Sequence, residues 1–314
     1  MMRLPRASLL LSALAPAIGA SAQQAAAPFT LVETGAGFRH LADAIGAVGE
    51  GTGTILVADG TYRECAVQGA GTITIRARTR GGAIFDGATC EGKAALVLRG
   101  AGATIDGLVF RNLRVPDGNG AGIRLERGDL TVSDTAFRDS EEGILAGSDE
   151  QGRVVIDRST FHGLGRCDRD LDCAHSLYIG HYGTLTITRS RFEAGRGGHY
   201  VKSRALRVDI SDNSFDDSQG HATNYMIDLP AGATGRIDGN VMVQGRDKEN
   251  YSAFIALGAE GGEQSSDGLE ISGNRARFVP GVVRSSAFLA DWTGARLALG
   301  DNILAQGISR YERR

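Results

Sequence analysis

The chain has 314 residues, including 45 glycines and only 6 prolines, and its formal net charge is −3 at pH 7. Without residues 1–22, which contribute Arg3 and Arg6 and no acidic side chain, the charge of −3 loses two positive charges and becomes −5. This balance excludes a general nucleic-acid-binding surface, which would be basic. The glycine content, with little helical periodicity, is typical of a fold built from many short strands and tight turns.

The N-terminus has the features of a signal peptide. Arg3 and Arg6 precede an apolar stretch from Leu9 to Ala20, and Ala20-Ser21-Ala22 has the small-x-small pattern of a cleavage site. We therefore predict a signal peptide over residues 1–22, a type of N-terminus found in bacteria, and a periplasmic or secreted protein. The apolar stretch is too short to cross a bilayer, and no later segment resembles a membrane helix. Residues 23–314 are expected to form a single domain.

Two elements are predicted before the regular part of the chain begins. The segment from Phe38 to Ala47 (FRHLADAIGA) has the pattern of an amphipathic helix. We expect it to cap the first turn of a stacked structure and to cover its open edge. The segment from Thr54 to Glu64 (TILVADGTYRE) is predicted to form the first strand and turn.

An imperfect repeat then runs through the rest of the chain. Its units recur at separations between 23 and 34 residues, counted from the apolar residue that closes each unit. The closing residues are Phe110, Phe137, Phe161, Phe192, Phe215, Met242, Ala276 and Leu304.

Each repeat has an alternating apolar strand, a turn of Asp, Ser, Gly or Asn, and the closing apolar residue, as in LTVSDTAF, which ends at Phe137. Alternation places one side chain inside and the next outside, and the turn residues tolerate the left-handed backbone of a sharp corner. A helical solenoid would need longer runs with 3.6-residue periodicity, and a β-sandwich would not need equal units. The pattern predicts an all-β fold, a parallel β-helix solenoid with an N-terminal capping helix.

The capping helix, the strand that follows it, the segment Gly60-Thr61-Tyr62-Arg63-Glu64 and the ladder of repeats together resemble the pectin-lyase-like superfamily. That resemblance implies a right-handed parallel β-helix and action on polysaccharides. The nearest local match is Lys202-Ser203, which is similar to the lysine–serine pair of the alginate and chondroitin lyases. The second motif of those lyases, an arginine followed by His-Gly, is not recognisable. The catalytic patterns of pectinesterases, polygalacturonases and pectate lyases are also missing.

The 4 cysteines all follow the predicted signal peptide, so export would allow them to pair. We prefer a bond between Cys167 and Cys173, which closes a short loop, and one between Cys65 and Cys90, which lie one repeat apart. Four cysteines allow three connectivities, so the sequence alone leaves the others open.

Titratable and aromatic residues are concentrated in one part of the repeat. Five of the 6 histidines fall within sixty residues, and four tyrosines accompany them. We expect a carbohydrate-binding site there, for which the substrate-binding candidates are His175, His181, His199, Tyr200 and Tyr225.

The apolar alternation also predicts which side chains of this region face outward. Leu177, Val201 and Ile227 are expected to point inward in three successive coils. The outward positions then stack on one patch, with His175 and His199 one coil apart near its rim. The outward set comprises Tyr178, Gly180, Lys202, Arg204, Met226 and Asp228.

These outward residues match the needs of β-elimination from a uronate polymer, which requires a cation to neutralise the carboxylate, a base, and an acid near the leaving oxygen. We expect Arg204 to neutralise the carboxylate and Lys202 to be the base if Arg204 lowers its pKa. Tyr178, Tyr200 or a histidine would supply the acid, and Asp228 would orient a cation or serve a hydrolase instead. Adjacent Lys and Arg side chains are also common on a solvated face.

Two loops add weaker candidates. The loop between Cys167 and Cys173 carries Asp168, Asp170 and Asp172 at alternate positions, a pattern that could hold Ca²⁺, although a solvated acidic loop at the rim is the more common outcome. The clustered histidines lack the tight spacing of a zinc site. Glu260, between glycines after the strand AFIAL, is either a substrate contact or a turn residue.

The sequence therefore favours a polysaccharide lyase that acts on an acidic polysaccharide. We expect no required cofactor, no nucleic-acid partner and a monomer. The alternatives are a hydrolase that uses Asp228 with a second carboxylate, and a non-catalytic β-helix that binds glycans or cell-envelope material, since the fold alone does not separate these functions.

Overall fold

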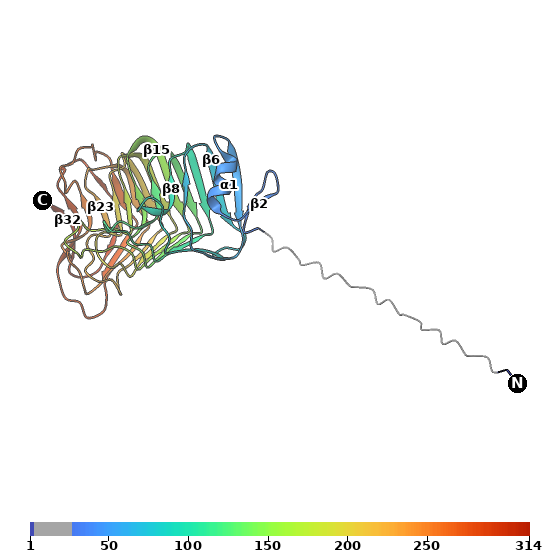
Figure 1. The fold of residues 1–314 in the computed structure, drawn as a ribbon. Helices are drawn as coiled ribbons and strands as arrows, with labels where there is room; N and C mark the ends of the chain where they lie inside the picture. Colours follow the sequence, from blue (N-terminus) through green and yellow to red (C-terminus); the bar gives the residue numbers. More distant parts are fainter. Residues whose placement is uncertain (3–26) are drawn as a thin grey trace.

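The computed structural model describes Met1, Met2 and residues 27–314. Apart from those first two residues, the predicted signal peptide and its cleavage site lie outside the described residues. The described chain winds into a right-handed parallel β-helix, an elongated solenoid with residues 27–62 at one end and the C-terminus at the other (Figure 1).

Three long sheets, here named A, B and C, form the sides of the solenoid. Sheet A contains β1 (Phe29–Leu31), β2 (Ala36–Phe38), β3 (Thr52–Val57), β6 (Thr72–Ala77), β9 (Gly102–Asp106), β12 (Asp129–Ser133), β15 (Asp149–Asp157), β18 (Tyr182–Thr188), β21 (Arg207–Ser211), β24 (Thr234–Asp238), β27 (Glu270–Ser272) and β30 (Ala298–Leu299). Sheet B contains β4 (Gly60–Tyr62), β7 (Ala83–Asp86), β10 (Val109–Arg111), β13 (Ala136–Arg138), β16 (Thr160–His162), β19 (Arg191–Glu193), β22 (Ser214–Asp216), β25 (Val241–Gln244), β28 (Arg275–Phe278) and β31 (Ile303–Leu304). Sheet C contains β5 (Ala66–Gln68), β8 (Ala94–Leu98), β11 (Ala121–Leu125), β14 (Glu142–Ala146), β17 (Leu177–Ile179), β20 (Val201–Ser203), β23 (Ile227–Leu229), β26 (Ala253–Leu257), β29 (Ser286–Asp291) and β32 (Ile308–Arg313).

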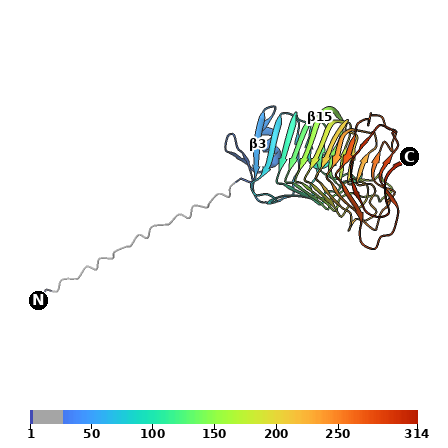
Figure 2. The same cartoon turned by 180° about the vertical axis from the view of Figure 1, so that it is seen from behind.

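Each coil of the solenoid contributes one strand to each sheet, and from β3 onward every strand pairs in parallel with the strand three elements later. Figure 2 shows the strands of sheet A, including β3 and β15, lying side by side along the solenoid. Strand neighbours in a sheet are about 4.8 Å apart, so residues at matching positions of successive coils form ladders. These ladders decide which functional side chains meet.

The N-terminal end differs in detail from the expectation. The predicted helix is present as α1 (Leu41–Val48), but it begins three residues later because Phe38 belongs to β2 and pairs with Phe29 of β1. Strand β1 also pairs antiparallel with β3, so this end is finished by a small antiparallel unit that the repeat pattern did not indicate. Helix α1 buries Leu41, Ala44 and Ile45 and lies at the end of the solenoid (Figure 1).

The interior is filled by the predicted ladder of closing residues. Phe110 pairs in register with Phe137, and the ladder continues coil by coil to Leu304. Adjacent phenylalanine rings from Phe85 to Phe215 stack with centroids 4.5–5.5 Å apart. The repeat inferred from the sequence therefore corresponds to one coil of the structure.

A ladder of asparagine side chains fixes the corner between sheets A and B. The amide of Asn213 donates to Asn240, which donates to Asn274, which donates to Asn302, with distances of 2.9–3.0 Å. Each side chain also binds backbone groups, so these buried amides have the partners that burial requires. This explains why the later repeats carry Asn just before the strand of sheet B.

Both predicted disulfides are present. Cys65 and Cys90 are bonded between neighbouring coils, and Cys167 and Cys173 close the short loop between β16 and β17. The first bond joins the segments that lead into β5 and β8, which are paired strands, and the second pins a loop at the edge of sheet C.

Candidate functional site

The outer face of sheet C carries a groove of about 600 Å³, built from β11, β14, β17 and β20 with loops on both sides. The outward side chains of these strands, which form the groove floor, include charged and aromatic residues, whereas their inward side chains are mostly apolar. The lining residues are Asn119, Arg124, Glu142, Leu145, Asp172, Cys173, His175, Tyr178, His199, Lys202, Arg204 and Glu260.

One ladder of outward residues runs along the floor of this groove. Arg124 is in register with Leu145, Leu145 with Tyr178, Tyr178 with Lys202, and Lys202 with Asp228. The structure therefore brings Tyr178, Lys202 and Asp228 together on the patch that the alternation predicted. Arg204, which follows the inward residue Ser203, joins them at the groove wall.

Lys202 and Arg204 hold one carboxylate between them. Lys202 Nζ lies 2.5 Å from Glu260 Oε1, and the Arg204 guanidinium donates to the other oxygen of Glu260. The two cationic side chains are 12% and 20% exposed, whereas the Glu260 side chain is 46% exposed. Glu260 therefore reaches in from a solvated loop, and the two cations fix its carboxylate in the groove.

Asp228 lies beneath this ion pair. It is 2% exposed, and its Oδ2 is 3.6 Å from Lys202 Nζ and 3.4 Å from His199 Nε2. Burial raises the pKa of Asp228 to about 6, against the opposing effect of the Lys202 charge. Its second oxygen has no hydrogen-bond partner among the described residues.

A second ladder, three positions before the first on each coil, contains both buried histidines. The His175 and His199 rings have centroids 4.9 Å apart, and the backbone N–H of His199 donates to His175 Nδ1. In its neutral form His175 therefore carries its proton on Nε2. Burial lowers the pKa of His175 to about 3 and, with its neighbours' charges, holds the pKa of His199 well below its usual value. Both rings are neutral at pH 7.

Tyr178 occupies the centre of the groove. Its ring is T-shaped against His175, with centroids 5.8 Å apart. Lys202 Nζ is 6.0 Å and the Arg204 guanidinium carbon 5.8 Å from the same ring. The Tyr178 ring thus lies beside both cations and beside His175.

Two charged residues of the groove, Arg124 and Glu142, were not among the sequence candidates. Glu142 precedes His175 in the second ladder and is 1% exposed, and burial raises its pKa to about 8. Both lie in coils before the histidine-rich segment. Aligning EEGILA with HSLYIG by their apolar positions would have placed Glu142 beside His175.

The structure corrects two orientations. Tyr200, expected to bind substrate, is 1% exposed, and its hydroxyl donates to Asp217 Oδ1 inside the solenoid. Met226, expected outward, also belongs to the core. The two residues are in register, and each is followed by another inward residue, so alternation is interrupted at the start of β20 and β23.

The remaining histidine and tyrosine candidates lie at different distances from the groove. Tyr225 continues the second ladder, and its ring stacks on His199 with centroids 5.5 Å apart. His181 does not line the groove. It lies in the turn before β18, and its Nε2 is 3.8 Å from Glu263 of the loop that also carries Glu260.

The loop between Cys167 and Cys173 forms part of the groove rim through Asp172 and Cys173. Asp168, one of the candidate Ca²⁺ ligands, instead accepts from Arg166. Within residues 27–314 no group of three or more His, Cys, Asp or Glu side chains is arranged to hold a metal ion.

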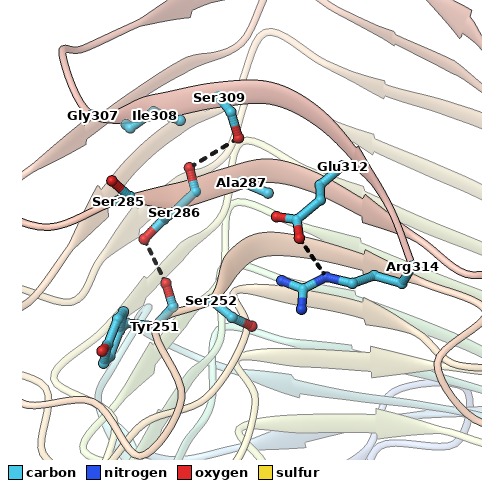
Figure 3. A pocket seen from close by; sticks show the side chains of 10 residues that line it. All are labelled: Tyr251, Ser252, Ser285, Ser286, Ala287, Gly307, Ile308, Ser309, Glu312 and Arg314. Atoms are coloured by element: carbon cyan, nitrogen blue, oxygen red, sulfur yellow. Dashed lines mark hydrogen bonds and ion pairs between the residues drawn. The ribbon is translucent and has the colours of Figure 1, made fainter.

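A second cavity of about 470 Å³ lies further along the same face, between β26, β29 and β32 (Figure 3). Serine hydroxyls and an ion pair between Glu312 and Arg314, with atoms 3.2 Å apart, surround it. Ser309 Oγ donates to the backbone carbonyl of Ser286, and Tyr251 closes one side. This cavity has hydroxyl groups but no cluster of cations.

Comparisons with known proteins found similar solved structures at low sequence identity. No protein-family model and no characterised protein sequence matches it. Among solved structures, a pectin methylesterase from Aspergillus niger is similar over 78% of this chain and 83% of its own, with 12% identity and a TM-score of 0.48. ORF18 of Geobacillus virus E2 is similar over 86% of this chain and 57% of its own, with 13% identity and a TM-score of 0.33. Neither likeness assigns a role to a residue of this chain.

Among the residues that the structure describes, no helix is both long enough and apolar enough to span a bilayer.

Proposed function

We propose that this chain is an exported carbohydrate-active protein whose groove binds a uronate-containing polysaccharide and cleaves it by β-elimination. The observation that carries the proposal is the carboxylate of Glu260 held jointly by Lys202 and Arg204. A site that binds one carboxylate in this way is already shaped and charged for another.

A substrate carboxylate would take the place of Glu260. Arg204 offers a planar fork that suits two carboxylate oxygens, and Lys202 adds a compact charge on the other side. Because the Glu260 side chain is half exposed, its displacement breaks two partly screened ion pairs, which the incoming carboxylate replaces. Neutralising the carboxylate makes the proton on the adjacent carbon more acidic and stabilises the anion that forms when it leaves.

Proton transfer is assigned to Tyr178, which stands between the two cations and His175. The tyrosine oxygen takes the proton from the carbon beside the carboxylate. Tyr178 accepts this proton as the ionised phenolate. The electron pair forms a carbon–carbon double bond, the bond to the leaving glycosidic oxygen breaks, and that oxygen receives the proton back from the Tyr178 hydroxyl, which restores the phenolate. Neutral His175, with its proton on Nε2, donates a hydrogen bond to the bound sugar.

This assignment changes the role expected for Lys202. Its ammonium lies 2.5 Å from Glu260 and 3.6 Å from Asp228, so it is paired with two carboxyl groups. A lysine held in this way neutralises charge and does not serve as the base. Asp228 then positions Lys202 from below.

Export is supported by the sequence of the first 22 residues and by the two disulfides. Disulfides form and persist in oxidising compartments such as the periplasm or the extracellular space. We therefore place the activity outside the cytoplasm.

The test is incubation with alginate, pectate, hyaluronan and glucuronan while the ultraviolet absorbance of the unsaturated product is followed. We expect a rise with at least one polymer, and a loss of about a hundredfold or more in kcat/KM for Arg204→Ala. Arg191→Ala removes an equally charged, half-exposed residue from sheet B and should leave the rate unchanged. Glu260→Gln should lower KM, because a competing carboxylate is gone.

The absence of any absorbance rise with all four acidic polymers would contradict the elimination. A gain of reducing ends without absorbance would instead identify a hydrolase. The observation that favours this second candidate is the pair of buried carboxyl groups with raised pKa, Asp228 at about 6 and Glu142 at about 8. Saturable binding without either product would identify a non-catalytic glycan-binding protein.

A further inference from the structure

The end of the groove nearest the N-terminus contains two buried polar atoms that lack partners. Arg124 Nε and Glu142 Oε2 are both inaccessible to solvent, and neither has a hydrogen-bond partner among residues 27–314. Glu126, two residues further along the chain, pairs with Lys93, and Glu141 pairs with Arg169. Burying such groups unpaired costs stability, so a pair of them that lines a groove indicates a ligand.

The two residues are placed by the two ladders of sheet C. Arg124 is three coils before Lys202 in the first ladder, so their backbones are about 14 Å apart at the usual strand spacing. Glu142 lies on the adjacent coil, in the second ladder, directly before His175. The Arg124 end and the Lys202 end are therefore two separate points in one continuous groove.

We propose that Arg124 and Glu142 form a second carboxylate-binding subsite, which selects a polymer that carries acid groups on more than one sugar. This subsite rests on the proposed function. It requires a substrate that is long enough to reach both Arg124 and Lys202. Arg124 supplies the charge, and Glu142, as a neutral carboxyl group, donates its O–H to the ligand carboxylate.

The surroundings of Glu142 support its role as a donor. Burial raises its pKa to about 8, outweighing the opposing effects of the His175 backbone N–H and the Arg124 charge, while Asp117 and Glu141 raise it further. The carboxyl group is thus protonated at pH 7. One of its oxygens accepts from the His175 backbone, and the other has no partner within the described chain.

A ligand that reaches only Lys202 and Arg204 gains nothing from Arg124. We therefore expect affinity to rise sharply at the chain length that first spans the two points. Loss of the Arg124 charge should remove that rise and leave the affinity for shorter ligands unchanged.

The test is calorimetric titration with a monouronate and with oligouronates of increasing length, in a Tyr178→Phe background that prevents cleavage. We expect Arg124→Ala to weaken binding of the long oligomers by about ten- to a hundredfold, as for a charged hydrogen bond, with no change for the shortest ligand. Arg127→Ala removes the same charge from an exposed turn of the same coil and is the matched control. Circular dichroism of each variant confirms folding.

Two substitutions of Glu142 separate donation from packing. Glu142→Gln keeps a neutral donor and should retain most of the length dependence, whereas Glu142→Leu should lose it. Equal weakening of all ligands by Arg124→Ala, or no weakening of any, would overturn the subsite. If oligomers bind in this length-dependent way but no unsaturated product forms in the wild type, the subsite stands and the elimination fails.

Discussion

At the scale of single residues, Lys202 lies between two carboxylates that differ in burial. Glu260 is half exposed and reaches in from a loop, while Asp228, on the neighbouring strand β23, is 2% exposed. The inner carboxylate belongs to the fixed floor, and the outer one can leave. This asymmetry allows a ligand carboxylate to exchange with Glu260 without unpairing Lys202.

The buried carboxyl group of Glu142 predicts a pH dependence of stability. Because its pKa rises from 4.5 to about 8 on folding, the folded chain holds this proton more tightly than the unfolded chain. The resulting stability is complete below pH 4.5 and is lost as the pH rises toward 8. Glu142→Gln removes this dependence, and relative to the wild type it should gain on the order of 3 kcal/mol of unfolding free energy between pH 4.5 and pH 7.

Denaturant unfolding of both proteins across this pH range measures the difference. Glu150→Gln, on the exposed surface, should follow the wild type at every pH. Parallel profiles for the wild type and Glu142→Gln would show that Glu142 is ionised in the folded protein.

Alternation along the strands was enough to predict the outward positions of Tyr178, Lys202 and Asp228, because period-2 geometry is a property of the backbone. It failed at Tyr200 and Met226, where two consecutive residues face the interior. The partner of the cations, Glu260, is placed by a loop whose course no periodicity encodes. Its position beside Lys202 could therefore be learned only from the structure.

At the scale of elements, the repeat works because each coil places equivalent residues over one another. The closing phenylalanines were predictable because they recur, and their stacking follows from the strand spacing. The antiparallel β1 and β2 were missed because each has only three residues and occurs once. The helix before the first coil was predicted from its amphipathic pattern.

The stacked ring of Phe161 makes a direct test of the interior ladder. It is fully buried, with the Phe137 ring centroid 4.9 Å away on one side and the Phe192 centroid 4.5 Å away on the other. Phe161→Ala leaves a cavity that neighbouring coils cannot fill, so we expect a loss of about 3–5 kcal/mol of unfolding free energy. Leu206→Ala, at a half-exposed position, should stay within about 0.5 kcal/mol of the wild type by the same denaturant measurement. A loss for Phe161→Ala no larger than this control would mean that the ladder is loosely packed.

At the scale of the whole molecule, the solenoid lines up equivalent positions of successive coils, and together they form a linear surface. The groove follows the outer face of sheet C, so its charged points recur along the direction in which the coils stack. A linear polymer laid along that face would meet Arg124 first and then Tyr178 and Lys202. This shape suits an extended acidic chain better than a compact ligand.

On this proposal, Lys202 and Arg204 form a carboxylate-binding site for such a polymer. The most direct measurement is the affinity of the Tyr178→Phe protein for an oligouronate and for the same oligomer with its carboxyl groups reduced to neutral alcohols. We predict binding of the acidic oligomer alone, and its loss in Arg204→Ala and Lys202→Ala. Equal binding of the acidic and neutral oligomers, or unchanged binding in both variants, would contradict the account.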